Sequence, residues 1–233
     1  DNDEAVLFVN SSTMTVVERG SGDGVQIWLG SKPWSSVKLA FETAKHVSFS
    51  EKEIVFDSSN WSSNSKAYVH FEAIDDWIDM GNLFNDQVNL TVASIDGGYE
   101  NIKARVFGSL EGTEVSALYV TVADDEESGI ISSVSVLHIG EASPSGSFTV
   151  TLGSQPLEDV VVSVSALSPS DFIVAPATLT FSAGNWNVSR TVLVTPVQDL
   201  VDEITNETHI CRLASSSADA KYSSNAPNTV VDV

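Results

Sequence analysis

Cysteine is almost absent from this sequence, because Cys211 is the single cysteine among 233 residues. No disulfide can therefore form within the chain, and a hydrophobic core must hold the fold together. Cys211 alternates with Leu213 in the string THICRLAS, which predicts a small buried side chain rather than a reactive thiol. Proline and glycine number 7 and 14, too few for a collagen-like or low-complexity chain.

Long apolar runs and basic residues are also scarce. No stretch of about 18 apolar residues occurs, so the sequence predicts no membrane span. No signal peptide is visible either, since the chain opens on Asp-Asn-Asp-Glu. Acidic residues outnumber basic ones by 32 to 11, for a net charge of −21. Such a surface repels nucleic-acid phosphates and anionic lipids, and it favours cations, either as bound calcium or as a diffuse counterion cloud.

The usual signatures of catalysis are missing too. The four histidines are scattered through the chain, no GxSxG string occurs, and no close His or Cys pair suggests a transition-metal site. An acidic sequence leaves paired carboxylates for glycoside hydrolysis open, but near-equivalent halves argue against one asymmetric active site. We therefore predict that the chain is not an enzyme.

The composition nevertheless predicts a folded chain, with 42% hydrophobic and 18% charged residues. Apolar side chains alternate with polar ones in short segments separated by Ser, Gly, Asn and Pro. This period of two is typical of half-buried antiparallel strands. The clearest segments are VQIWLG (25–30), VKLAFET (37–43), VNLTVAS (88–94), SFTVTLGS (147–154) and TVLVTPV (191–197).

The sequence repeats itself with an offset of roughly 123 residues. VERGSGDGVQIWLGSKP (17–33) resembles IGEASPSGSFTVTLGSQP (139–156), and EIVFDSSNW (53–61) resembles TLTFSAGNW (178–186). Further along, IDDWID (74–79) matches VQDLVD, and Tyr99 matches Tyr222. About seven short strands per repeat predict two tandem immunoglobulin-like antiparallel β-sandwiches, over residues 1–122 and 123–233. The paired Trp61 and Trp186 are interpreted as packing residues at the core or its edge.

The ends of the chain also resemble the junction between the repeats. YVTVADDEESG (119–129) is similar to VVDV at the C-terminus followed by DNDEAV at the N-terminus. We expect the chain to be one period of a longer array, with neighbouring copies joined head to tail. The joining is either covalent or by strand addition between subunits.

The order of motifs in each repeat resembles the Calx-beta family and its looser immunoglobulin-like relatives. A glutamate precedes an LGSxP strand end, and an F…NW turn, an Asp-containing segment, a Tyr-bearing loop and a closing V-x-V strand follow. The family occurs in long tandem arrays of adhesins and other extracellular proteins. The resemblance also implies that a glycosylated surface filament of the mastigoneme type is one of the expected settings. The family's central GTA…G.DY motif is absent from both repeats.

The resemblance implies calcium ligands at one end of each sandwich. In the first repeat these would be Glu18, Asp76, Asp79, Asp124 and Asp125. In the second they would be Glu141, Asp199 and Asp202, completed by the Asp1/Asp3 segment of a following copy. Calcium takes six to eight hard oxygens, which carboxylates from several loops can supply. The alternative is that these acids are solvated loop residues in an acidic chain.

Five Asn-x-Ser/Thr sequons suggest a glycoprotein of the cell surface or extracellular space. Asn89 alternates with Val88 and Leu90, and Asn187 follows Trp186, so we expect both to face solvent. N-linked glycans are expected on at least two of the sequons. The five asparagines are Asn10, Asn60, Asn89, Asn187 and Asn206.

Three functions remain open at this level. The first is a structural repeat module of an extracellular filament, stalk or adhesin, and the second is a module that binds carbohydrate or protein. Its contact residues would be exposed aromatics such as Trp34, Trp77 or Tyr99, although we interpret the two tryptophans as packing residues at the domain ends. The third is a calcium-dependent adhesion domain.

Overall fold

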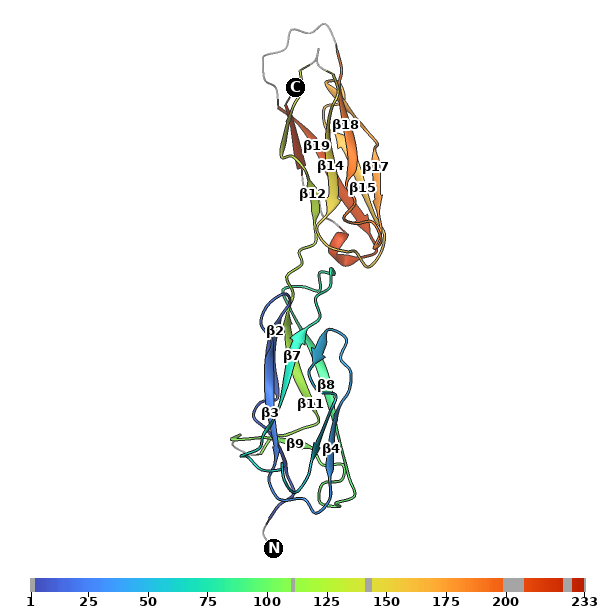
Figure 1. Ribbon diagram of the computed structural model, residues 1–233. Coiled ribbons are helices and arrows are strands. Elements are labelled where there is room, and N and C mark those ends of the chain that lie inside the picture. Colours follow the sequence, from blue (N-terminus) through green and yellow to red (C-terminus); the bar gives the residue numbers. More distant parts are fainter. Residues whose placement is uncertain (1–2, 110–111, 141–143, 199–207, 224–227, 233) are drawn as a thin grey trace. The chain divides into compact units, whose positions relative to one another are not determined.

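The computed structural model describes residues 3–109, 112–140, 144–198, 208–223 and 228–232. It confirms the predicted all-β class of two tandem sandwiches (Figure 1). The two compact units are Asp1–Asp76 with Met80–Asp125, and Trp77–Asp79 with Glu126–Val233. The first unit thus ends three residues beyond the position predicted from the repeat, because Asp124 and Asp125 bond back to it. Among the described residues, no helix has the length and apolar character that a membrane crossing requires.

The first unit is a sandwich of a six-stranded and a five-stranded sheet. The six-stranded sheet has the order β10-β9-β1-β3-β7-β5, and the five-stranded sheet the order β2-β11-β8-β4-β6. The strands are β1 (Leu7–Val9), β2 (Thr13–Val17), β3 (Asp23–Leu29), β4 (Val37–Phe41), β5 (Val47–Phe49), β6 (Glu53–Phe56), β7 (Ala67–Ala73), β8 (Leu83–Ser94), β9 (Ala104–Val106), β10 (Glu114–Val115) and β11 (Ala117–Ala123).

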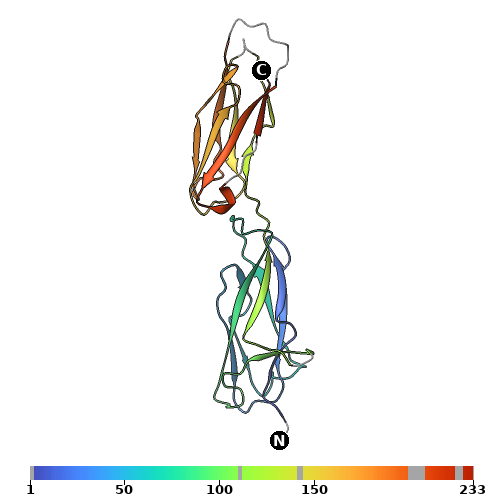
Figure 2. The ribbon, with the colours of Figure 1, turned by 180° about the vertical axis from the view of Figure 1, so that it is seen from behind.

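The second unit pairs a four-stranded sheet, β12-β14-β18-β16, with a five-stranded sheet, β13-β20-β19-β15-β17. One 3-10 turn, η1 (Ala220–Tyr222), lies in this unit (Figure 2). The strands are β12 (Ile130–Ser132), β13 (Val136–His138), β14 (Gly146–Leu152), β15 (Val160–Ala166), β16 (Phe172–Ala175), β17 (Thr178–Phe181), β18 (Arg190–Pro196), β19 (Thr208–Ser217) and β20 (Asn228–Asp232).

Each strand of the second unit has a counterpart in the first, in the same chain order and with the same neighbours. β12 corresponds to β1, β14 to β3, β18 to β7 and β20 to β11. The first unit has two additional strands, β9 and β10, which extend its sheet beyond β1. In the described part of the second unit no strand pairs with that side of β12.

The strand pairs are mostly antiparallel, as predicted, and three pairs are parallel. β1 pairs with β9, β2 with β11 and β13 with β20 in parallel. The pairs β2–β11 and β13–β20 are parallel because the first strand of each repeat is split: β1 joins one sheet and β2, after a bend at residues 10–12, joins the other. The second segment meets the closing strand of its repeat, which runs in the same direction.

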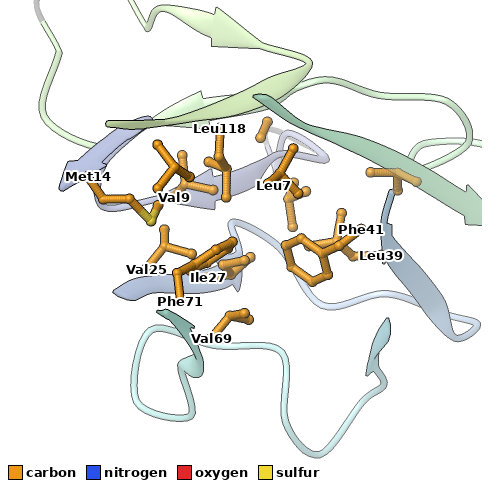
Figure 3. Close-up of a cluster of buried hydrophobic side chains, with 14 of the residues drawn as sticks. Leu7, Val9, Met14, Val25, Ile27, Leu39, Phe41, Val69, Phe71 and Leu118 are labelled. Atoms are coloured by element: carbon orange, nitrogen blue, oxygen red, sulfur yellow. The ribbon is translucent and has the colours of Figure 1, made fainter. Parts of the chain in front are cut away.

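Alternating apolar side chains fill the space between the sheets of each unit. In the first unit, Leu7, Val9, Val25 and Ile27 point inward together with Leu118 of β11 (Figure 3). The second core is built from the equivalent strands and includes Cys211, which is fully buried, so its predicted core position is confirmed. Burial raises the pKa of this thiol to about 11, which keeps it protonated at neutral pH.

A tyrosine closes the same corner of both sandwiches. The Tyr99 hydroxyl donates to the carbonyl of Ser31 at 2.6 Å and accepts from the Ser31 N–H at 3.2 Å. Tyr222 makes the same pair of bonds with Ser154, at 2.7 and 3.0 Å. We call these two arrangements the tyrosine anchors.

A buried aspartate supports each tyrosine anchor. Asp96 accepts from the backbone N–H of Trp34 at 2.9 Å, and Asp219 accepts from that of Leu157 at 2.8 Å. The repeat in the sequence thus preserves a hydrogen-bonded connection between distant loops, and that connection fixes the corner of each sandwich.

Candidate metal site

The candidate site lies at the end of β2 and β11 in the first unit. Glu18 follows β2 directly, and its N–H donates to the carbonyl of Ala123 at 3.0 Å, which continues the β2–β11 ladder by one residue. That bond brings the Glu18 carboxylate, 3% exposed, beside Asp125. Asp75 enters from the segment after β7.

The carboxylate oxygens of Glu18, Asp75 and Asp125 lie within 4.8 Å of one another. Calcium holds its oxygen ligands at about 2.3–2.6 Å, so two ligands on opposite sides of the ion are roughly 5 Å apart. The spacing and the donor chemistry therefore suit a divalent cation of this kind, and the acidic group could hold a metal ion.

A positive charge already lies against this group. The Nε of Arg19 is 3.1 Å from a carboxylate oxygen of Asp75, and its Nη1 is 3.3 Å from one of Asp125. Arg19 occupies a left-handed backbone position, with φ of 51°, in the turn that follows β2. The three side chains are between a third and a half exposed, so each ion pair is weak and a metal ion can compete with it.

Of the ligands that the resemblance implied, Glu18 and Asp125 come together in this group. Asp124 instead accepts from the N–H of Met80 at 2.7 Å, and Asp76 lies 3.8 Å from Nδ1 of His46. Glu141, Asp199 and Asp202 lie outside the described residues, as does Asp1.

Asp79 belongs to the second unit, where Lys221 approaches it at 2.6 Å and the N–H of Ser128 at 2.8 Å. Burial raises the pKa of Asp79, but these partners outweigh it and hold the pKa below its usual value. Asp79 is thus ionised and paired with a lysine of its own unit.

Asp75 is the member of the acidic group that the sequence analysis did not identify. The repeat alignment places Gln198 opposite Asp75, so the position did not stand out as a shared acid. The available signal was its place in the string IDDWID, next to the predicted Asp76. The carboxylate of Asp75 is thus a member of the acidic group that has no acidic counterpart in the second repeat.

The sequons differ in how their side-chain amides are used. Asn10, Asn89 and Asn187 are exposed, as expected for Asn89 and Asn187, while Asn60 is half-buried. The Nδ2 group of Asn60 donates to the carbonyl of Val55, and that of Asn89 donates to Glu42. Asn206 lies outside the described residues.

The aromatic residues considered for ligand binding separate into three cases. Tyr99 is buried in its tyrosine anchor and is not available to a ligand. Trp34 is 72% exposed, so its interpretation as a packing residue was wrong. Trp77 is half-exposed, and the centre of its ring lies 5.9 Å from that of Trp186 within the second unit. Trp61 and Trp186 pack against their cores, as predicted.

No protein-family model matches this chain, and no curated protein matches it. Among solved structures, CBD12 from CALX1.2 is similar over 91% of this chain and 81% of its own, at 13% identity and a TM-score of 0.37. The calcium-binding domain CBD12 of CALX1.1 is similar over 90% of this chain and 79% of its own, at 14% identity and a TM-score of 0.35. The YadV chaperone is similar over 96% of this chain and 98% of its own, at 6% identity and a TM-score of 0.35. At these identities and TM-scores, nothing that those proteins bind or do follows for this chain.

Proposed function

We propose that this chain is a non-catalytic structural module of a long extracellular glycoprotein, acting as a spacer in a filament, stalk or adhesin. The proposal rests on the residues that recur at corresponding positions in the two units. The residues that recur are Tyr99 and Tyr222 with their serines, Trp61 and Trp186 at the core edge, and the buried aspartates. All of them stabilise the sandwich, so the repeat preserves a scaffold.

The surface supports the same proposal. A net charge of −21 keeps neighbouring modules soluble and apart, and exposed sequons offer sites for glycans in both units. In this proposal the partners are neighbouring copies of the repeat, joined head to tail along the chain or by strand addition, and the location is the cell surface or the extracellular space.

The test is the denatured mass of the native polypeptide before and after enzymatic removal of N-glycans. A spacer array predicts a mass of several hundred kilodaltons that falls on deglycosylation. A native mass near the 24.8 kDa of this chain, unchanged by the enzyme, would contradict both the array and the glycoprotein.

A second function, calcium-dependent stiffening or adhesion, is favoured by the acidic group at Glu18, Asp75 and Asp125. If the site binds calcium at micromolar affinity, millimolar calcium stabilises the first unit by about 4 kcal/mol. Thermal melts of the whole chain with calcium and with chelator measure this gain, and magnesium serves as the competing ion. A melt that does not respond to chelator would remove this function and leave the spacer untouched.

Two substitutions sharpen the calcium test. Glu18→Gln removes one carboxylate and should abolish most of the gain, whereas Glu51→Gln, an exposed acid outside the group, should not. Arg19→Ala removes the competing cation; an exposed ion pair is worth roughly 0.2–1 kcal/mol, so calcium affinity should rise up to about fivefold. If Arg19 is instead the group's permanent counter-ion, Arg19→Ala lowers stability equally with calcium and with chelator.

A further inference from the structure

Three aromatic side chains form a cluster on the outer face of the six-stranded sheet. Phe8 of β1 and Trp28 of β3 are cross-strand partners whose rings stack with centroids 5.6 Å apart. Phe107 follows β9, and its ring meets Phe8 and Trp28 edge-on at 5.6 and 5.1 Å. We call these three residues the aromatic platform.

The aromatic platform is covered on one side and open on the other. Trp28 is only 4% exposed, and the Nζ of Lys66 lies 4.5 Å from the centre of its ring. Phe107, in contrast, is 59% exposed. An apolar ring held against two others, with most of its surface in water, gains free energy when another apolar surface covers it.

The platform is not part of the repeated scaffold. The counterparts of Phe8 and Trp28 in the second unit are Ile131 and Thr151, at the same places in β12 and β14. Phe107 is carried by the additional β9–β10 segment, which has no counterpart in the described part of the second unit. Among the described residues, the aromatic platform is therefore a feature of the first unit alone.

Asn10, the first sequon, lies directly beside the platform. The parallel register pairs Val9 with Val106, so one residue further along Asn10 lies beside Phe107, and the N–H of Phe107 bonds to the carbonyl of Val9 at 2.8 Å. The alternation along the strand places Asn10 on the same face as Phe8.

The side chain of Asn10 is oriented for modification. Its Oδ1 accepts from the N–H of Gln26 at 2.7 Å, which fixes the amide at the exposed end of β1. Its Nδ2, the atom that takes a glycan, makes no hydrogen bond in the described part of the chain. The Nδ2 groups of Asn60 and Asn89 are, in contrast, committed to Val55 and Glu42.

We propose that Asn10 carries an N-linked glycan whose first sugar packs its apolar face on Phe107. The transfer forms a bond between C1 of that sugar and Nδ2 of Asn10, breaks the C1–O bond of a lipid-linked oligosaccharyl pyrophosphate, and releases the Nδ2 proton. The lipid pyrophosphate leaves. The inference rests on the proposed extracellular glycoprotein and names the residue and surface that one glycan uses.

A double-mutant cycle tests the inference on the whole chain secreted from a glycosylating host. Mass spectrometry of peptides first measures the occupancy of each sequon. Thermal melts then compare the parent with Asn10→Gln, Phe107→Ala and the double variant, before and after trimming of the glycans to the first sugar. Asn187→Gln, an exposed sequon of the second unit, is the matched control.

We expect Asn10 to be occupied and Phe107→Ala to lower the Tm of the first unit by about 2–5 °C more in the glycosylated parent than in Asn10→Gln. The difference should persist after trimming, because the first sugar makes the contact. Equal losses in both backgrounds, or an unmodified Asn10 while other sequons are occupied, would overturn the inference alone. If no sequon is occupied, the proposed glycoprotein fails with it.

Discussion

The two tyrosine anchors bind serines with different access to water. Ser154 is fully buried, whereas Ser31 is half-exposed. Tyr222→Phe leaves buried backbone groups without a partner and should cost about 1–3 kcal/mol, while Tyr99→Phe should cost about 0.5–1.5 kcal/mol, since water can reach Ser31. Denaturant unfolding of the whole chain measures both values, and each should appear in the transition of its own unit.

The control for this comparison is Tyr68→Phe, because Tyr68 is exposed on β7. It should change the free energy of unfolding by less than about 0.5 kcal/mol. A larger loss for Tyr99→Phe than for Tyr222→Phe would show that burial of the serine does not decide the strength of the anchor.

Single residues also mark where sequence reasoning stops. The periodic pattern indicated that Cys211 is buried and Asn89 exposed, because alternation alone decides the face of a strand. It did not identify Asp75 as a member of the acidic group, since that depends on how the segment after β7 approaches the end of β2. The pairing of Asp79 with Lys221 depends in the same way on contacts between residues 142 positions apart.

At the level of elements, strands with clear alternation were predictable and the strands that differ between the units were not. β3, β4, β8, β14 and β18 overlap the alternating segments of the sequence, and β8 begins before its segment. β9 and β10 have only three and two residues, too few for a period to appear, and their pairing beside β1 is set by tertiary contacts. The split of the first strand into β1 and β2 was not predicted either, because two short segments so close together in the sequence resemble one interrupted strand.

The additional strands explain why the first unit carries the aromatic platform. β9 pairs with the side of β1 that has no partner strand at β12 in the described part of the second unit, and Phe107 directly follows β9. The additional strands thus change the outer face of one sandwich, and they also add Ala104 to its core. This is consistent with a scaffold that repeats while its surface diverges.

At the level of the whole molecule, the two units share the order of their corresponding strands, the position of their cores and their tyrosine anchors, and they differ in the strands β9 and β10 and in surface features. A module of this kind suits repetition, since each unit has a hydrophobic core of its own. The internal repeat could be recognised from the sequence because anchor residues such as Tyr99 and Tyr222 recur at fixed spacing.

The measurement that tests the spacer most directly is electron microscopy of the native cell surface with an antibody raised against this chain. A spacer predicts label at regular intervals along a filament or stalk. Label confined to one end of such a structure, one site per filament, would contradict the account and assign the chain to a terminal binding role.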